Sequence, residues 1–198
     1  MAEDQSYPRV KKFFFLFIFI LSFSKANSEN FKFIKIANLN NPWGSSFLNN
    51  DEMIVTEKSG LIKIVNIINN QVNDVEHNLN FLEDGQGGLL DILHQENKVW
   101  ISYTENRGNR KTSTSIALAN LDKKNLVFKN IFQANPPIDS GYHFGSRLAI
   151  KGKYLYASAG ERGKGMIAQD ASKHPGSIIR IHLDGSIPND NPKFDGKP

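Results

Sequence analysis

The sequence predicts an all-β protein built from repeated small sheets, like the blades of a β-propeller. Apolar and polar residues alternate in short runs that clusters of glycine, asparagine and aspartate separate, a pattern typical of antiparallel strands. No run of ten or more residues has the spacing of an amphipathic helix. Similar strand–loop–strand units begin near Met53, Val99 and Tyr154, 46 and 55 residues apart, and this spacing indicates propeller blades.

The same alternation places the individual strands. A strand is expected within residues 31–39, where FKFIKIANL alternates, and one on each side of the Ser-Gly turn within residues 52–66. Residues 98–122 repeat this form around a longer basic tip, and residues 153–165 and 176–188 repeat it again. An immunoglobulin-like sandwich is the alternative, but its strands usually pack into about 100 residues.

Residues 1–28 are predicted to be a signal peptide. Basic residues precede the apolar run at 13–23, and Ala26 and Ser28 stand at the small-residue positions of a cleavage site. The run is shorter than the roughly 20 residues that a membrane-spanning helix needs. An uncleaved membrane anchor is the alternative. Cleavage predicts a periplasmic or secreted protein without stable membrane insertion.

The remaining residues, 29–198, are expected to form one incomplete domain. At roughly 40–50 residues or more per blade, this length holds about three blades. Three blades do not close a ring, and an open edge leaves strand hydrogen-bonding groups unpaired. The sequence therefore predicts the first part of a larger propeller.

Charge and cysteine content narrow the function classes. Residues 29–198 carry 20 basic and 18 acidic side chains, which is too balanced and scattered a charge for nucleic-acid binding. The chain has no cysteine, so it tolerates an oxidising compartment without gaining stability from disulfides.

Seven segments together resemble the soluble quinoprotein sugar dehydrogenases, the glucose/sorbosone dehydrogenase family, and most closely its aldose sugar dehydrogenase branch. The resemblance covers nearly all of residues 29–198 and keeps the family's order. It implies a six-bladed β-propeller of which this chain is the N-terminal half. The segments are NPWGSSFL (41–48), MIVTEKSGLIKIV (53–65), GQGGLLDI (85–92), HFGSRLAI (143–150), GERGKG (160–165), AQDASKHPGSIIRI (168–181) and DGSIPNDNP (184–192).

The resemblance implies that His143 is the catalytic general base. Oxidation of an aldose at its anomeric carbon removes the hydroxyl proton while a hydride passes to pyrroloquinoline quinone (PQQ). Histidine suits the first task because imidazole ordinarily titrates near neutral pH, while the cofactor carries the redox chemistry. The alternative is a partly buried histidine that bonds to the backbone at the start of a strand.

Gln86 is the second position that carries over, as a contact to the sugar. An uncharged amide can both donate to and accept from sugar hydroxyls. The glycines around Gln86 would let the loop approach a substrate closely. A glycine-rich turn with an exposed glutamine is the alternative.

Several other residues in the matching segments are expected to have structural roles. Arg147 is expected to orient its loop, and Asp91 to bracket a turn. NPWG predicts a turn with Trp43 packed as an anchor. The role of Glu161 is open, because the family more often has aspartate there.

The family uses PQQ and calcium, but its main quinone contacts lie in the second half of the propeller. The resemblance therefore assigns no cofactor-binding residue and no metal ligand to this chain. Residues 184–192 lack the D-x-D-x-D-G loop with its distant glutamate, so solvated turns are expected there. PQQ carries three carboxylates, which are costly to desolvate without cations. The chain is therefore expected to bind PQQ weakly and to be inactive alone.

The expected partners are an aldose sugar and an external electron acceptor. Tyr142 stands where the glucose dehydrogenase branch has an aspartate before the base, so a carboxylate cannot be assumed at that point. A non-catalytic exported β-propeller used for binding is the alternative function, because one fold hosts many functions.

Overall fold

The computed structural model describes residues 31–193. All of its strands lie in the unit that begins at Lys35. The predicted signal peptide, residues 1–28, lies outside the described residues. Within residues 31–193, no helix has the length and apolar character that crossing a membrane requires.

The described residues form three sheets whose strands mostly follow one another along the chain. The first contains β1 (Pro42–Phe47), β2 (Glu52–Glu57), β3 (Leu61–Asn66), β4 (Val72–His77) and the short parallel strand β8 (Asn125–Leu126). The second contains β5 (Leu89–Gln95), β6 (Lys98–Asn106), β7 (Thr112–Asn120) and β9 (Lys129–Gln133), and the third β10 (Gly145–Lys151), β11 (Tyr154–Ala159) and β12 (Ser177–His182). The helical content of residues 31–193 is one 3₁₀ segment, η1 (Gly165–Gln169).

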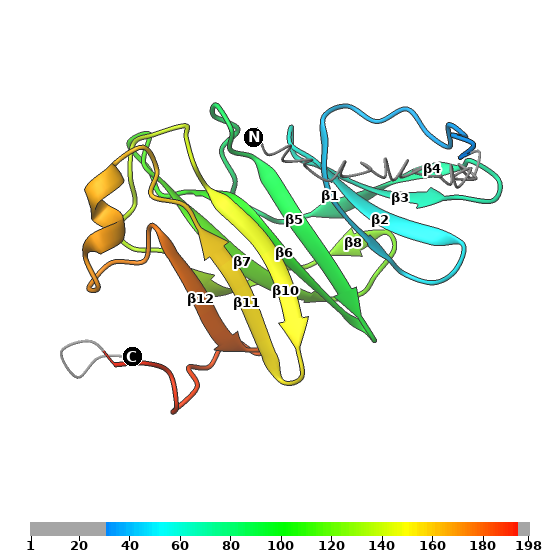
Figure 1. Cartoon of the computed structure of the whole chain (residues 1–198). Helices are drawn as coiled ribbons and strands as arrows, with labels where there is room; N and C mark the ends of the chain where they lie inside the picture. The colour runs from blue at the N-terminus through cyan, green and yellow to red at the C-terminus, as the bar shows by residue number, and fades with distance from the viewer. Residues whose placement is uncertain (1–30, 194–198) are drawn as a thin grey trace, which may run out of the picture. The chain divides into compact units, whose positions relative to one another are not determined.

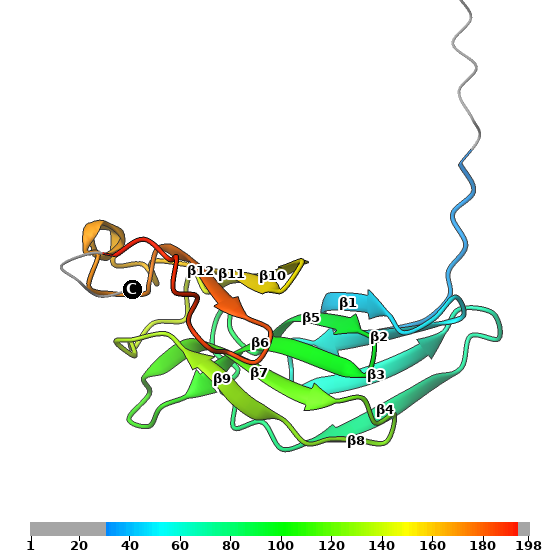
Figure 2. The ribbon, with the colours of Figure 1, turned by 90° about the horizontal axis from the view of Figure 1, so that it is seen from below.

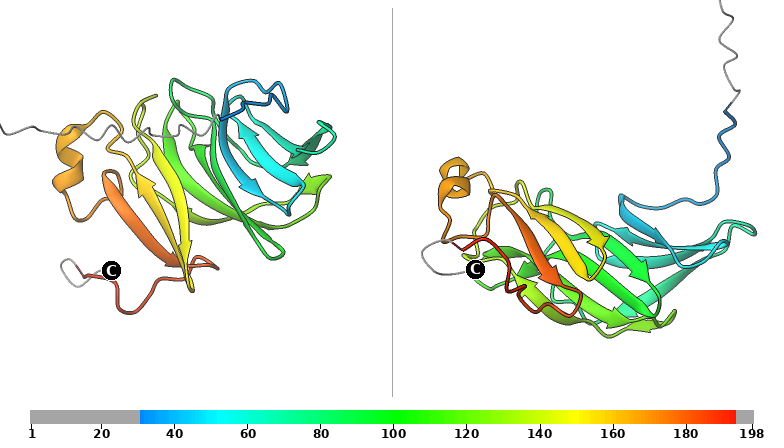
Figure 3. Two further views of the ribbon diagram at one scale, coloured as in Figure 1. Left: turned by 45° about the vertical axis from the view of Figure 1, so that its right-hand side comes forward. Right: turned by 60° about the horizontal axis from the view of Figure 1, so that its bottom comes forward.

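The sheets lie side by side, with the second between the first and the third (Figures 1 and 3). The leading strand of the second sheet, β5, contacts β1 and β2 on one side and β10 on the other. Figure 2 shows the same order from below. The units expected near Met53, Val99 and Tyr154 are confirmed, because β2, β6 and β11 are each the second strand of their sheet.

Two apolar cores fill the spaces between the sheets. The strand β6 contributes to both, because its side chains alternate between its two faces. Val99, Ile101 and Tyr103 belong to the core shared with the first sheet, whereas Trp100 belongs to the core shared with the third. Both faces of the second sheet are therefore buried, which explains why β6 and β7 are almost wholly buried.

Each leading strand carries an irregularity at the same place. The register between the first and second strands shifts between Pro42 and Ser45, between Leu89 and Ile92, and between Gly145 and Leu148. A β-bulge of this kind frees backbone groups from the ladder and increases the local twist. These freed groups meet side chains of the neighbouring sheet.

Hydrogen bonds across the bulges hold the sheets to one another. Thr56 Oγ1 donates to the carbonyl of Leu90, and Ser102 Oγ donates to the carbonyl of Ser146 over 2.6 Å. Asp91 extends this pattern, because its Oδ2 accepts from the backbone N–H of Leu148 over 2.8 Å. Threonine and serine of the second strands thus play equivalent parts at two successive sheet boundaries.

Asp91 is a correction to the sequence prediction, which placed it at a turn. It lies inside β5, is 2 % exposed, and its Oδ1 accepts from Nη1 of Arg147 over 2.9 Å. A buried carboxylate needs such partners because its desolvation is costly. Gly44 adjoins it from the first sheet, and a Cβ there would overlap the Asp91 backbone and side chain.

Two further predictions near the first strand are wrong. Residues 31–39 contain no strand, and NPWG is not simply a turn, since β1 begins at Pro42. Asn41, with φ of +49°, turns the chain, and proline is tolerated as the first residue of an edge strand. Trp43 is 43 % exposed and is not a packed anchor.

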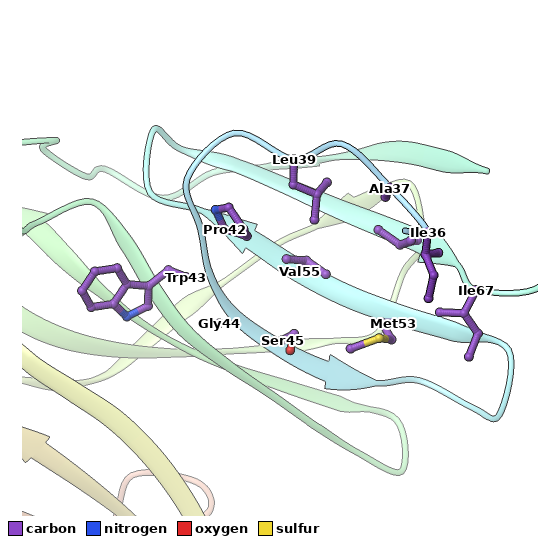
Figure 4. A pocket seen from close by; sticks show the side chains of 11 residues that line it. Ile36, Ala37, Leu39, Pro42, Trp43, Gly44, Ser45, Met53, Val55 and Ile67 are labelled. Carbon is purple, nitrogen blue, oxygen red and sulfur yellow. The ribbon is translucent and has the colours of Figure 1, made fainter. Parts of the chain in front are cut away.

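Three residues of the 31–39 segment line a pocket on the first sheet. Ile36, Ala37 and Leu39 help to line an open apolar pocket of about 280 Å³ on the first sheet (Figure 4). Met53 and Val55 lie on its sheet side. The later apolar residues of the segment therefore contact a sheet face without pairing as a strand, whereas Phe31, Phe33 and Ile34 are exposed.

Replacing Asp91 by alanine is expected to destabilise the chain by about 2–3 kcal/mol, because the buried N–H of Leu148 loses its acceptor. Arg147 contributes little to this figure, since its side chain is 70 % exposed. The measurement is the free energy of unfolding in denaturant. Asp74→Ala, which removes an exposed ion pair with Lys63, serves as the control and should cost less than about 1 kcal/mol. An equal effect of the two substitutions would contradict the role given to Asp91.

Candidate functional site

Three loops meet at one end of the second and third sheets. Gln86 lies in the loop before β5, His143 lies two residues before β10, and Glu161 follows β11 by two residues. These strand ends share one edge because β10 and β11 are antiparallel and β5 lies beside β10. The edge is at the top in Figure 1. The fold thus brings together residues that are 57 and 18 positions apart in the chain.

Gln86 contacts the loop that carries His143. The backbone N–H of His143 donates to Oε1 of Gln86 over 2.9 Å, and the backbone N–H of Gln86 donates to the carbonyl of Gly141 over 2.7 Å. Both residues are exposed. The two predicted site residues are therefore adjacent, and the amide of Gln86 fixes the backbone at the predicted base.

Glu161 binds the imidazole of His143. Its Oε1 pairs with Nδ1 of the ring and also accepts from the backbone N–H of Gly163 over 3.1 Å. The hydrogen bond from His143 is the largest cause of a lowered pKa of the Glu161 carboxyl. A carboxylate at Nδ1 favours the tautomer that carries its proton there, which leaves Nε2 as the acceptor. The imidazole is 53 % exposed, so solvent and ligands can reach it.

The backbone around His143 is held in an uncommon conformation. His143 has φ of +50°, in the left-handed region that few residues other than glycine, asparagine, aspartate and histidine adopt readily. Gly160 lies against it, and a Cβ at position 160 would overlap the carbonyl group of His143. The glycine after β11 is thus required for the close approach of the two loops.

Two neighbours of the site differ in role. Tyr142 is exposed, and its ring centroid lies 6.2 Å from that of His143 in an edge-on arrangement. Arg147 extends from the bulge of β10 to the carboxylate of Asp91, which agrees with the structural role expected for it. Tyr142 stands where the glucose dehydrogenase branch has an aspartate, and it presents an aromatic ring beside the imidazole.

A fourth residue of the site, Arg162, was not predicted from the sequence. It is buried directly behind His143 and donates to the backbone of the same loop. Its predecessor Glu161, whose role was open, is the partner of the imidazole. Both lie in the family-like segment GERGKG (160–165), but that segment does not by itself show that Glu161 meets the imidazole or that Arg162 is buried.

The described residues do not fit PQQ or calcium on their own. Lys58 donates to the carbonyl of Gly85 over 2.7 Å, Arg147 pairs with Asp91, and Arg162 donates to carbonyls of the His143 loop, so these three cationic side chains are already engaged. Three carboxylates of PQQ would need several further cations. Within residues 31–193, no group of three or more His, Cys, Asp or Glu side chains is placed to hold a metal ion.

Residues 184–192, weighed above as calcium ligands, form turns after β12. Their carboxylates have local partners. Asp184 accepts from Ser186, and Asp190 pairs with Arg180 over 2.7 Å. These contacts account for the lowered pKa values of both carboxyl groups without a metal ion.

A model of the glucose/sorbosone dehydrogenase family matches residues 39–198. The chain belongs to this family. It is 32 % identical over 164 residues to the aldose sugar dehydrogenase YliI of Escherichia coli K12, a match that covers 78 % of this chain and 44 % of that protein. It is 27 % identical over 218 residues to quinoprotein glucose dehydrogenase B of Acinetobacter calcoaceticus, covering 88 % and 44 % of the two chains.

Solved structures of the family agree with the fold. The apo-form of the soluble aldose sugar dehydrogenase of Escherichia coli matches with a TM-score of 0.76 and 30 % identity, over 81 % of this chain and 50 % of that one. The PQQ-bound aldose sugar dehydrogenase of Streptomyces coelicolor matches with a TM-score of 0.70 and 26 % identity, over the same shares. The family and the all-β propeller fold are confirmed, and the chain spans about half the length of these relatives.

Replacing His143 by alanine is expected to raise the pKa of the Glu161 carboxyl towards its ordinary value of 4.5, because the hydrogen bond that lowers it most is lost. A lowered pKa stabilises the folded state above the ordinary value and ceases to do so as the pH falls through the lowered one. The variant should therefore lose less stability than the parent between pH 4.5 and the lowered pKa. Carboxyl ¹³C NMR titration gives the pKa directly. His94→Ala, at the other end of β5, should leave it unchanged, and an unaltered pKa in the His143 variant would contradict the pairing.

Proposed function

We propose that the complete protein is a quinoprotein oxidoreductase that oxidises the anomeric carbon of aldose sugars, with PQQ as the electron acceptor. The observation that supports this most is the exposed imidazole of His143, which pairs with Glu161 while Gln86 binds its backbone N–H, in a chain of this family. A histidine with a carboxylate at one nitrogen and open access at the other is the arrangement expected of a general base.

The described residues can account for removal of the hydroxyl proton. Oxidation of the anomeric C–OH group removes a proton from oxygen and a hydride from carbon. Nε2 of His143 would accept the proton, and Glu161 at Nδ1 would hold the required tautomer and stabilise the imidazolium that forms. Gln86 binds the backbone N–H of His143 and Tyr142 lies edge-on to its ring, so both are candidates for contact with a sugar at Nε2.

The hydride acceptor belongs to another part of the protein. Lys58, Arg147 and Arg162, beside the three loops, are engaged with protein groups, as described above. We therefore assign the binding of PQQ and calcium to residues outside 31–193. We expect the 198-residue chain alone to be inactive. A non-catalytic sugar-binding propeller is the competing function.

The reaction can be tested on the protein that the gene encodes, read beyond the codon for Pro198. With PQQ and calcium, that protein is expected to reduce an artificial electron acceptor when an aldose is added. His143→Gln should lower kcat by roughly 10²- to 10⁴-fold, the usual contribution of a general base. His94→Gln is the matched control and should retain full turnover. Full turnover in the His143 variant would remove the assignment, and no aldose oxidation by the parent would favour the binding module.

The 198-residue chain by itself is expected to bind PQQ about 100-fold more weakly than the complete protein. The reason is that Lys58, Arg147 and Arg162 already bind protein groups and cannot serve the three carboxylates of PQQ. Quenching of tryptophan fluorescence during titration with PQQ measures both affinities, and Trp43 and Trp100 are the reporters. Equal affinities would show that the described residues form the quinone site after all.

A further inference from the structure

Arg162 is the most buried cationic side chain near the site. It is 2 % exposed, and its backbone has φ of +59°. Burial without partners would be very costly for a guanidinium, so its hydrogen bonds show what it holds. They all lead to protein groups around His143.

The guanidinium binds two elements at once. Nε donates to the carbonyl of Tyr142 over 3.0 Å, and Nη2 donates to the carbonyl of Ser140. Nη1 donates to the carbonyl of Thr112 over 3.1 Å, and Nη2 also reaches Oγ1 of Thr112 over 2.7 Å. Arg162 therefore ties the loop of His143 to the start of β7.

Both peptide groups that flank His143 are held by Arg162. The carbonyl of Tyr142, which belongs to the peptide group before His143, accepts from Nε. The carbonyl of His143, in the peptide group after it, accepts from the backbone N–H of Arg162 over 3.3 Å. The guanidinium also stacks on the ring of Phe144, 3.7 Å from its centroid. These contacts restrain the two dihedral angles that define the left-handed conformation of His143.

Glu161 and Arg162 thus act on one histidine from consecutive positions. Glu161 binds the imidazole, and Arg162 binds the backbone that carries it. A direct contact of Arg162 with substrate is excluded in this structure by its burial and by its engaged donors. Burial lowers the pKa of Arg162 to about 10, partly offset by Asp84, so the group stays charged at neutral pH.

We propose that Arg162 is a positioning residue, which fixes the left-handed backbone at His143 so that the imidazole meets Glu161 with Nε2 directed to the substrate. The catalytic importance of Arg162 rests on the proposed function, but the contacts that it makes with the His143 loop do not. Lysine should not replace Arg162, because an ammonium group lacks the planar set of donors that reaches Tyr142, Ser140 and Thr112 together.

The test compares Arg162→Met and Arg162→Lys with Arg180→Met in the 198-residue chain. Arg180 is a matched control because it also stacks on an aromatic ring, Tyr154, at 4.1 Å, but lies in β12 and makes no hydrogen bond to the His143 loop. Imidazole ¹⁵N chemical shifts of His143 report the tautomer, and thermal unfolding reports stability. Both Arg162 variants should shift the ¹⁵N signals towards a tautomer mixture, whereas Arg180→Met should lower stability and leave them unchanged.

Two further measurements keep the outcome decisive. If Arg162→Met does not fold, Thr112→Val removes one acceptor of the guanidinium and should shift the same signals to a smaller extent. In the complete protein with PQQ and calcium, Arg162→Lys should lower kcat by about 10²-fold with little change in KM, as expected when the His143 imidazole is misplaced. Unaltered ¹⁵N signals in every folded Arg162 and Thr112 variant would overturn the proposal. Shifted signals in an enzyme that tolerates His143→Gln would keep the positioning role and reject the proposed chemistry instead.

Discussion

The buried hydrogen bond between the Asp91 carboxylate and the backbone of Leu148 is the contact on which the site depends. It joins β5 of the second sheet to β10 of the third at their bulges. The loops that precede these two strands carry Gln86 and His143. Because the strands are fixed within hydrogen-bond distance, their loops are too, and Oε1 of Gln86 reaches the backbone of His143. A hydrogen bond at a sheet boundary thus helps to set the distance between two predicted site residues.

Much of the fold could be predicted from local pattern. The hairpins of β2–β3 and β6–β7 follow from alternation and from the turns between them, which are properties of neighbouring residues. Residues 31–39 have the same alternation but form no strand, because pairing depends on a distant partner that the pattern does not specify. The bulges could not be predicted from the sequence either, since a register shift arises between two strands and not within one.

The candidate site divides in the same way. His143 and Gln86 could be named because their segments resemble a known family, and their adjacency is a new finding of the structure. Glu161 and Arg162 could not be assigned, because their roles come from a loop of the third sheet folding back over the loop of His143. A buried arginine whose hydrogen bonds end mainly on carbonyl oxygens leaves almost no trace in sequence, since the acceptors are present at every residue.

The left-handed backbone at His143 and Arg162 has a consequence for protein engineering. Random libraries at these two codons would be mostly unproductive, because β-branched and bulky side chains are strained in that region. If the proposed function holds, a library aimed at sugar preference would do better to diversify Tyr142 and to keep His143 and Arg162 constant. Directed evolution of this surface is therefore narrowed by main-chain geometry before any chemistry is considered.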